Sequence, residues 1–338
     1  MEVPEYDLPE AAIAQHPADP RDSSRLLDAT DPSGGIVHRV FRDLPLLLGA
    51  GDVLVVNTTR VMPARLRLSK RTGGAAEVLL LEPSGASGEW TAMVRPGRRL
   101  QPGTDLYADT EGAPLLRVGD PVEPGDSSDG RRMVTLLDDP GKVLELCGTI
   151  ALPPYIHEPL DDPERYQTVY ADEPGSVAAP TAGLHLTPEL IACCESGGVE
   201  VHSVDLAVGL ATFKPIAVAD AADHRMHTER YRVPEPTMDA CRRARRVVAI
   251  GTTVVRALET AAATGELEGE SHLYIQGDYP FALVDVLVTN FHMPRSSLLV
   301  LLESFCGPRW RDLYTEALAE GYRFLSFGDA MIVGRRVS

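Results

Sequence analysis

Short runs of β-branched residues that lead into helices recur along the second half of this chain. Residues 247–251 form one such run, and a helix follows it after a pair of threonines. Residues 282–289 form a second run, which leads through a polar loop into an apolar helix at 297–304. Folds that alternate buried strands with helices pack those helices on a sheet. The pattern therefore predicts an α/β domain.

The middle of the chain, from residue 66 to residue 149, has a different character. Short runs of alternating apolar and polar residues are separated there by Gly, Pro, Asp and Ser, which is typical of a small antiparallel β-domain. The runs lie at 76–82, 90–94, 115–118 and 132–137. We predict a large α/β domain with a mixed sheet, formed by residues 1–65 and 150–338, and a small antiparallel β-barrel domain inserted at residues 66–149.

The composition is that of a globular protein. Of the 338 residues, 44% are hydrophobic and 24% are charged, which are ordinary values. No stretch approaches the ~18 consecutive apolar residues of a membrane-spanning helix, and the N-terminus lacks the basic and apolar segments of a secretory signal. The five cysteines form no Cys-x-x-Cys pair, and their odd number fits reduced thiols. We expect a cytoplasmic protein with no membrane partner.

The net charge of −17 repels polyanions such as nucleic acid at long range. A local basic surface can nevertheless bind phosphates on an acidic protein. Three clusters of cations are candidates for such a surface, and a solvated surface without a ligand is the alternative for each. The clusters are Arg60/Arg65/Arg67/Lys70/Arg71, Arg95/Arg98/Arg99 and Arg242/Arg243/Arg245/Arg246.

A loop of small residues at 175–185 ends at a single imidazole, His185. Thr187 and Pro188 suit the N-cap and the first position of a helix, so the loop brings backbone amides and His185 to a helix start. Such a terminus can bind an anion, and residues without bulky side chains, such as Gly183, let a ligand approach the backbone closely. The alternative is a tight connector whose histidine is merely packed.

Polar residues follow several of the predicted strands. Asn57 ends one strand, and Arg60 comes shortly after it. Thr252 and Thr253 follow a second strand, and Asn290 follows a third. Ligands of open α/β sheets gather at the carboxyl ends of the strands, and a strand–turn–helix junction offers free amides there. We therefore predict a binding site formed by these strand ends.

His224, His227 and Glu229 lie close together in the sequence and present a choice of chemistry. A metal site would need a third ligand and a helical spacing that the sequence does not show, so we predict no metal. Imidazole titrates near neutral pH, which favours acid–base work. The alternative is a loop whose histidines bond backbone groups. Glycine-rich patterns that bind nucleotide phosphates are also lacking.

Ordered motifs run through the chain from its start to its end. They include Arg-Asp-Ser-Ser-Arg at 21–25, Asn-Thr-Thr-Arg-Val-Met-Pro-Ala-Arg at 57–65, Ala-Ala-Pro-Thr-Ala-Gly-Leu-His at 178–185, His-Arg-Met-His-Thr-Glu at 224–229, Thr-Asn-Phe-His at 289–292 and Gly-Asp-Ala-Met at 328–331. In this order they resemble the motifs of the S-adenosylmethionine:tRNA ribosyltransferase-isomerase family of the queuosine pathway. The resemblance covers nearly the whole chain, and it implies the same large α/β domain with an inserted antiparallel β-barrel.

The resemblance also implies a reaction. S-adenosylmethionine is the substrate, and its ribosyl part is transferred to 7-aminomethyl-7-deazaguanine at the wobble position of tRNA and rearranged there. The product is epoxyqueuosine, and adenine and methionine are released. The positive sulfonium acidifies the neighbouring 5′ carbon of the ribose, so a nearby base can remove a proton and start ring opening.

These considerations give a hypothesis for the site. His185, His224, His227 and His292 surround the adenosyl pocket, and Glu229 and Asp329 orient imidazoles. Arg60 or Arg256 binds the methionine carboxylate. The catalytic candidates are His185, His224, His227, Glu229 and His292. The substrate-binding candidates are Asn57, Arg60, Thr181, Gly183, Thr252, Thr253, Arg256, Asn290 and Asp329.

The chain departs from the family's pattern in a few places. The family's Thr-Leu-His-Val-Gly-x-Gly-Thr-Phe reads here as residues 205–213, where Ala207 replaces the histidine and Ala211 a glycine. The family's Tyr-Pro-Gly-Phe segment becomes Gln-Gly-Asp-Tyr at 276–279, and aromatic positions become Leu186 and Leu325. Because residues 205–213 depart from the family pattern, the identity of the molecule that accepts the ribosyl group stays open. The alternatives are a paralogue that uses S-adenosylmethionine with a small-molecule acceptor or as a lyase, without tRNA, and a non-catalytic module that binds tRNA or a nucleotide.

Overall fold

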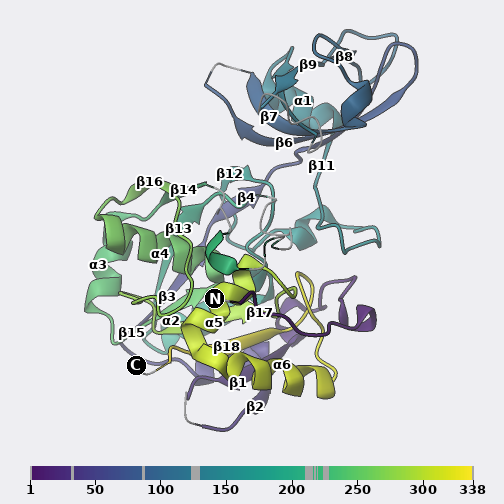
Figure 1. Ribbon diagram of the computed structural model, residues 1–338. Coiled ribbons are helices and arrows are strands. Elements are labelled where there is room, and N and C mark those ends of the chain that lie inside the picture. Colours follow the sequence, from purple (N-terminus) through teal and green to yellow (C-terminus); the bar gives the residue numbers. More distant parts are fainter. Residues whose placement is uncertain are drawn as a thin grey trace. The chain divides into compact units, whose positions relative to one another are not determined.

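The structure, a computed structural model, describes residues 2–31, 34–85, 88–122, 130–209, 216, 218, 220–223 and 228–336 (Figure 1). The chain divides into two compact units. The large unit consists of Met1–Arg60 and Pro153–Ser338, and the small unit consists of Val61–Leu152.

A mixed sheet forms the centre of the large unit, with nine strands in the described residues. Their order is β16 (Glu268–Ser271), β14 (Glu229–Arg232), β13 (Glu200–Leu206), β3 (Asp52–Asn57), β15 (Arg246–Ile250), β17 (Val286–Asn290), β18 (Ala330–Gly334), β1 (Arg25–Ala29) and β2 (Val37–Val40). The neighbours β13, β3, β15 and β17 are parallel. β18 is antiparallel to β17 and parallel to β1, and the outer strands pair antiparallel. The predicted α/β fold with a mixed sheet is confirmed.

Both faces of this sheet are covered because its central strands bury side chains on both sides. All six residues of β3 are buried: Val53 and Val55 belong to one apolar cluster, and Leu54 and Val56 belong to another. The helices with residues in the first cluster are α3 (Glu235–Arg243), α4 (Thr252–Thr264), α5 (Ser297–Cys306) and α6 (Trp310–Ala319). The second cluster includes residues of α2 (Pro188–Ser196). The large unit therefore has three layers.

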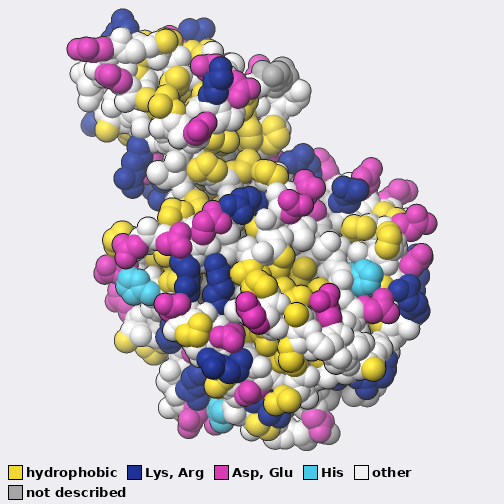
Figure 2. All heavy atoms as spheres, turned by 180° about the vertical axis from the view of Figure 1, so that it is seen from behind, with side chains coloured by type: hydrophobic (Ala, Val, Ile, Leu, Met, Phe, Trp, Pro, Cys, Tyr) yellow, Lys and Arg dark blue, Asp and Glu magenta, His cyan; other side chains and the backbone are white. Residues whose placement is uncertain are grey.

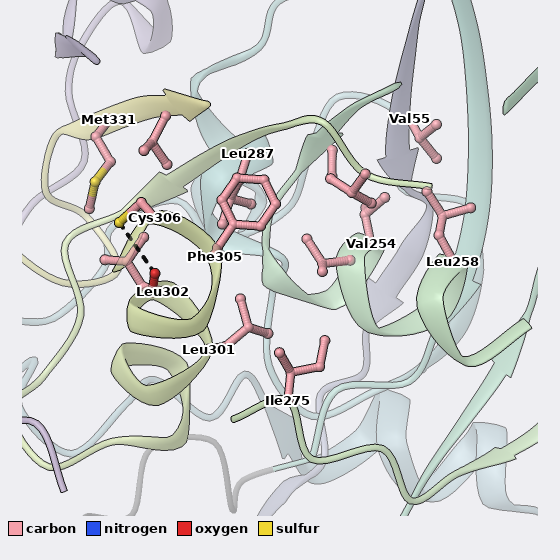
Figure 3. Packing of buried hydrophobic residues seen from close by; sticks show 14 of the residues in the cluster. Val55, Val254, Leu258, Ile275, Leu287, Leu301, Leu302, Phe305, Cys306 and Met331 are labelled. Atoms are coloured by element: carbon pink, nitrogen blue, oxygen red, sulfur yellow. Dashed lines mark hydrogen bonds between the residues drawn. The ribbon is translucent and has the colours of Figure 1, made fainter. Parts of the chain in front are cut away.

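The first cluster shows how the helices are held on the sheet (Figure 3). Leu287 of β17 lies close to Phe305 of α5, and Leu258 of α4 lies near Val55 of β3. Each large apolar side chain that is fully buried contributes about 1.5–3 kcal/mol through its removal from water. This packing fixes the position of the helices, and with them the loops that connect the helices to the strands.

The carboxyl ends of β3, β15 and β17 lie at the same edge of the sheet, because these strands are parallel neighbours. After β15 the chain turns directly into α4 through Gly251, whose φ of 95° lies in the region that favours glycine. After β17 it passes through an irregular segment to Ser296, whose side chain caps α5 by accepting a hydrogen bond from the amide of Leu299 at 3.2 Å. This edge therefore gathers loops and helix starts.

The small unit is built from an antiparallel sheet with seven strands in its described residues. Their order is β11 (Gly148–Thr149), β5 (Arg65–Ser69), β6 (Ala75–Pro83), β7 (Glu89–Arg95), β10 (Arg131–Leu136), β9 (Leu116–Pro121) and β8 (Asp105–Leu106). Alternate residues such as Leu66, Val78 and Val94 are buried, so one face of the sheet lines the interior. A bridge between Ser69 and Tyr107 joins the end of β5 to the residue after β8. The sheet thus curls back on itself, as the predicted antiparallel barrel requires.

Short elements complete the two units. The small unit also contains α1 (Pro140–Cys147), and β4 (Thr59–Val61) pairs with β12 (Glu173–Ser176). The 3₁₀ turns are η1 (Glu10–Ala12), η2 (Arg21–Ser23), η3 (Phe41–Leu46), η4 (Gly97–Arg99), η5 (Pro163–Tyr166), η6 (Thr181–His185), η8 (Ala221–Asp223) and η9 (Gly307–Arg309).

Candidate active site

A cavity of about 640 Å³, part of it open to solvent, lies in the large unit. Its wall combines the turn η6 with residues that follow β15 and β17. The predicted site residues that line it are Thr181, Thr252, Thr253, Asn290 and His292. The cavity thus lies at the carboxyl ends of parallel strands, where open α/β sheets bind their ligands.

A chain of hydrogen bonds links Thr181 to His185. The Thr181 hydroxyl lies 2.8 Å from Oδ1 of Asn290, and Nδ2 of Asn290 lies 3.4 Å from Nε2 of His185. Nδ1 of His185 lies 2.8 Å from the hydroxyl of Ser24. Because Nδ2 of Asn290 can only donate, Nε2 of His185 accepts this hydrogen bond. Nδ1 of His185 then carries the ring proton and donates it in a hydrogen bond to the Ser24 hydroxyl. The network therefore assigns a neutral tautomer to His185.

Asp329 supports this network without bonding an imidazole directly in the described residues. Its carboxylate accepts hydrogen bonds from the amides of Arg25 and Arg323, at 3.0 and 2.8 Å, and from the Arg323 guanidinium at 3.1 Å. Its backbone carbonyl accepts from Nδ2 of Asn290 at 3.3 Å. The predicted link from Asp329 to an imidazole thus passes through Asn290, which bonds His185.

His292 is held against the cavity from several sides. Its Nε2 lies 3.0 Å from the hydroxyl of Thr289. Its backbone carbonyl accepts from the hydroxyl of Tyr6 at 2.6 Å, and its amide donates to Tyr314 at 2.7 Å. Among the described residues no hydrogen-bond partner of Nδ1 is found. The described residues therefore orient the ring through one nitrogen, Nε2.

Burial makes both of these imidazoles poor bases. It lowers the pKa of His185 to about 4, although the nearby negative charge of Asp329 opposes the shift. It lowers the pKa of His292 to about 3. Both side chains are therefore neutral at pH 7, and each can accept and donate a hydrogen bond without bringing a charge to the cavity.

Two further site candidates shape the cavity wall from behind. Asn57 is fully buried, and its Nδ2 donates to the carbonyl of Leu206 at 3.0 Å and to the hydroxyl of Thr253 at 3.3 Å. It therefore ties β3 and β13 to the start of α4. Gly183 lies within η6, where a Cβ would overlap the hydroxyl of Tyr170. Only glycine fits there without a shift of the tyrosine.

The two arginine candidates are engaged elsewhere. Arg256 and Glu229 form an ion pair whose side chains are each 5% exposed, and Nε of Arg256 donates to the carbonyl of Leu273 at 3.3 Å. Arg60 lies on the surface with its Nη2 2.6 Å from the carboxylate of Glu164. Neither arginine lines the cavity. Glu229 is paired with Arg256 and also accepts from the amide of Gly209 at 3.4 Å.

Of the remaining candidates and three of the family departures, some lie in described residues and some do not. His224, His227 and Ala211 lie outside the described residues. Ala207 directly precedes Val208, which lines the cavity, but Ala207 itself is not among the lining residues. Residues 276–279 are not among those that line the cavity.

Leu325 lines the cavity and does not lie in a strand, because β18 begins only at Ala330. Its φ is 67°, a left-handed conformation that costs a residue with a Cβ roughly 1–2 kcal/mol. Two backbone hydrogen bonds hold this turn. The amide of Leu325 donates to the carbonyl of Phe291 at 3.1 Å, and the amide of Gly328 donates to the carbonyl of Leu325 at 2.9 Å. The segment before β18 is thereby kept as a tight turn against the cavity.

Several lining residues were missed from the sequence. Tyr155 follows the predicted inserted domain, and its hydroxyl lies 2.7 Å from that of Ser326 in the turn before β18. Burial raises the pKa of Tyr155 to about 12, so this hydroxyl stays protonated. Met293 and Ser296, which follow His292, also line the cavity. Met293 and Ser296 could have been expected at the cavity because they lie close to His292 in the sequence. Tyr155 had no such signal.

No group of three or more His, Cys, Asp or Glu side chains in the described part of the chain is arranged to hold a metal ion. No described helix combines the length and the apolar character that crossing a membrane requires.

Comparison with known proteins gives consistent matches along the chain. A family model described as "Queuosine biosynthesis protein" matches residues 2–333. The chain is 50% identical over 330 residues to the S-adenosylmethionine:tRNA ribosyltransferase-isomerase of Rubrobacter xylanophilus, covering 97% of this chain and 96% of that protein. It is 44% identical to the enzyme of the same name from Thermotoga maritima, with 97% and 98% covered. A crystal structure of S-adenosylmethionine tRNA ribosyltransferase from Thermotoga maritima is similar to it with a TM-score of 0.54 and 36% identity, over 97% of this chain and 99% of that one.

Proposed function

The chain belongs to the queuosine biosynthesis protein family, and on this premise we propose that it is an S-adenosylmethionine-dependent ribosyltransferase-isomerase. It transfers the ribosyl part of S-adenosylmethionine to 7-aminomethyl-7-deazaguanine at the wobble position of tRNA and isomerises it. The products are epoxyqueuosine, adenine and methionine. The observation that carries the proposal is the 50% identity to an enzyme of that name over 97% of this chain. The relatives cited above all bear a name that includes tRNA, so nothing favours the small-molecule or lyase alternative.

The cavity of the large unit is the proposed binding site for S-adenosylmethionine. Thr181, Asn290 and His292 offer hydroxyl, amide and imidazole groups to the ribose and the adenine. His292 presents Nδ1, whereas His185 holds Asn290 in place from behind. A neutral lining suits a cationic sulfonium because it avoids repulsion.

For the methionine carboxylate, Arg60 and Arg256 were the candidates, but both have carboxylate partners outside the cavity lining. The start of α4 offers an alternative. The amides of Thr252 and Thr253 lie in the first turn of this helix and have no intrahelical acceptor, and the helix dipole favours an anion there. We therefore assign the carboxylate to the α4 N-terminus, with Arg256 neutralising Glu229 behind it.

Proton transfer needs a group with a pKa near the working pH. The low pKa values of His185 and His292 make them unsuitable, and we propose that they orient groups and donate hydrogen bonds. The proton acceptor is proposed to be His224 or His227, with Glu229 as the neighbouring carboxylate. Alanine replacement of each histidine, with the rate of adenine release as readout, separates the two.

We propose different roles for the two domains. We propose that residues 1–65 and 150–338 form the catalytic domain and that residues 66–149 form an inserted domain without catalytic residues. Neither the S-adenosylmethionine site nor the candidate base requires a residue of the insert. The use of tRNA as acceptor places the protein in the cytoplasm.

Release of adenine and methionine tests the function. The purified chain is incubated with S-adenosylmethionine, with and without tRNA that carries 7-aminomethyl-7-deazaguanine, and both products are quantified by chromatography. We expect equal amounts of both products, formed only with the modified tRNA. Release at the same rate without tRNA would support the lyase alternative. Asn290→Ala should abolish release, whereas Thr264→Val, a threonine at the far end of α4, serves as the matched control.

A further inference from the structure

Two of the basic clusters noted in the sequence come together on the small unit. The strand register places Arg65 opposite Leu79 of β6, Leu79 opposite Met93 of β7, and Met93 opposite Arg131 of β10. In the next row, Arg67 of β5 is opposite Glu77, and Glu77 is opposite Arg95 of β7. Residues directly opposite each other share one face of a sheet. The arginine rows, defined as Arg65, Arg67, Arg95 and Arg131, therefore lie on one face.

This face is the outer one. The residues between the arginine positions, such as Leu66, Val78 and Val94, are buried in the interior, and side chains alternate between the two faces of a strand. Arg67 and Arg95 are exposed, and Arg65 and Arg131 are partly exposed. Further along the same strands the outward positions become acidic, at Glu82 and Glu89, so the basic area is bounded.

Two of these arginines, Arg67 and Arg95, carry charge that the described residues do not neutralise. Within the described residues neither Arg67 nor Arg95 forms an ion pair, although Glu77 lies between them in the register. Lys70, the residue after β5, donates from Nζ to the carbonyl of Arg99 at 2.6 Å and brings two more cations to the same end of the sheet. On a chain with a net charge of −17 such a concentration of cations suits an anionic partner.

The third basic cluster is a useful contrast. Arg242 pairs with Asp239 at 3.6 Å, and Arg243 pairs with Glu200 at 2.9 Å. Arg245 and Arg246 both pair with the buried carboxylate of Asp52. Figure 2 likewise shows acidic and basic side chains interspersed over the visible face of the large unit. Paired arginines of this kind hold the fold together and leave little charge for a ligand.

We propose that the arginine rows bind the phosphate backbone of the tRNA substrate. The choice of tRNA rests on the proposed function. The size of the surface supports a polyanion, because Arg65 and Arg131 are three strand spacings apart, about 14 Å, and Arg67 and Arg95 are about 10 Å apart. A single phosphate cannot contact both ends. Exposed guanidinium groups suit phosphate oxygens, and such contacts position a nucleic acid without reading its sequence.

The test uses the salt dependence of tRNA binding, because the slope of log affinity against log salt is proportional to the number of phosphates that the protein contacts. Affinity of the full chain for an unmodified tRNA transcript is measured by fluorescence anisotropy at several salt concentrations, for the wild type and for R67Q/R95Q. The slope of log affinity against log salt should fall by about 2 in the variant, because each lost phosphate contact lowers it by about 1. A fourfold rise in salt should therefore weaken the variant about tenfold less than the wild type.

The matched control is R117Q, because Arg117 is an exposed arginine of the same unit whose Nε lies 2.7 Å from the carboxylate of Asp105. It should keep the wild-type slope, and both variants should bind S-adenosylmethionine as the wild type does. An unchanged slope in R67Q/R95Q, or an equal loss in R117Q, overturns the proposal. The proposal is also overturned if R67Q/R95Q binds tRNA as the wild type does but loses binding to phosphatidylserine vesicles. Binding of an unmodified transcript needs no reaction, so this assay tests the arginine rows alone. A failure of the proposed catalytic function is recognised separately, because adenine is then not released.

Discussion

Replacing Arg256 by methionine should lower the free energy of unfolding of the large unit by about 3–5 kcal/mol. The magnitude follows from burial. Arg256 and Glu229 are each 5% exposed, so removal of the guanidinium leaves a carboxylate that water cannot reach. A comparable pair on the surface contributes at most about 1 kcal/mol. Arg243, 58% exposed and paired with Glu200, provides that comparison, and R243M should change the stability by less than about 1 kcal/mol.

The double variant R256M/E229Q separates the ion pair from packing. It removes both charges, while glutamine keeps an acceptor for the amide of Gly209. Its stability should exceed that of R256M by more than about 2 kcal/mol, because the buried negative charge is removed together with its counter-ion. Equal stability of the single and double variants, or a loss below about 1 kcal/mol in R256M, would refute the reasoning.

The chain offers a clean probe for this measurement. It has two tryptophans, Trp90 in the small unit and the fully buried Trp310 in the large unit. In a Trp90→Phe background, urea unfolding followed by fluorescence reports on the large unit alone. The same variants decide the role of Arg256 in binding. If Arg256 only neutralises Glu229, R256M/E229Q binds S-adenosylmethionine normally; loss of binding at restored stability would assign the carboxylate to Arg256 instead of the α4 N-terminus.

Three further changes test the neighbourhood of the cavity. The folded-state pKa values of His185 and His292 lie below the ordinary value of about 6.5, so the unfolded state takes up protons first and stability should fall as the pH drops from about 6.5 to about 4; a flat profile in urea titrations contradicts their burial as neutral groups. Gly183→Ala should raise the KM for S-adenosylmethionine and lower the melting temperature, because the new Cβ displaces the Tyr170 hydroxyl, and unchanged values of both would show that η6 adapts freely. Glu259→Ala should destabilise the large unit by several kcal/mol in urea unfolding, since its buried carboxylate accepts three backbone amides, whereas a loss below about 1 kcal/mol would mean that other acceptors replace it.

Much of the fold was predictable because it depends on local patterns. The β-branched runs identified β3 and β15, and Thr187 and Pro188 marked the first residues of α2, where the Thr187 hydroxyl accepts from the amide of Leu190 at 3.1 Å. A Gly-Gly pair, a typical helix stop, directly follows Ser196 at the end of α2. Each of these signals operates within a few residues of the chain.

Element boundaries that depend on distant groups were not predictable. The strand predicted at 282–289 begins only at Val286, because the Glu259 carboxylate binds the amides of Ala282, Leu283 and Val284 before the ladder starts. The closing strand begins at Ala330, since Asp329 and the left-handed Leu325 hold the preceding residues in a turn. In both cases a side chain far away in the sequence, or an unusual backbone angle, decides the outcome.

The site was predictable where it consists of strand ends. Thr252, Thr253 and Asn290 follow buried strands, and all three line the cavity. Tyr155 gave no signal, because its contact with Ser326 joins residues 171 positions apart. The pairing of Arg256 with Glu229 was equally hidden, since it joins residues of α4 and β14 that lie 27 positions apart in the sequence.

Transfer of label to tRNA tests the central claim most directly. S-adenosylmethionine labelled in the ribose, and separately in the methyl group, is incubated with the chain and with tRNA that carries 7-aminomethyl-7-deazaguanine, and the tRNA is then isolated and its nucleosides are analysed by mass spectrometry. The ribosyl label should enter the modified nucleoside, with one adenine released per label, and the methyl label should leave with methionine. Methyl label in the tRNA, or ribosyl label found only in small molecules, would contradict the assignment of this chain as a ribosyltransferase-isomerase acting on tRNA.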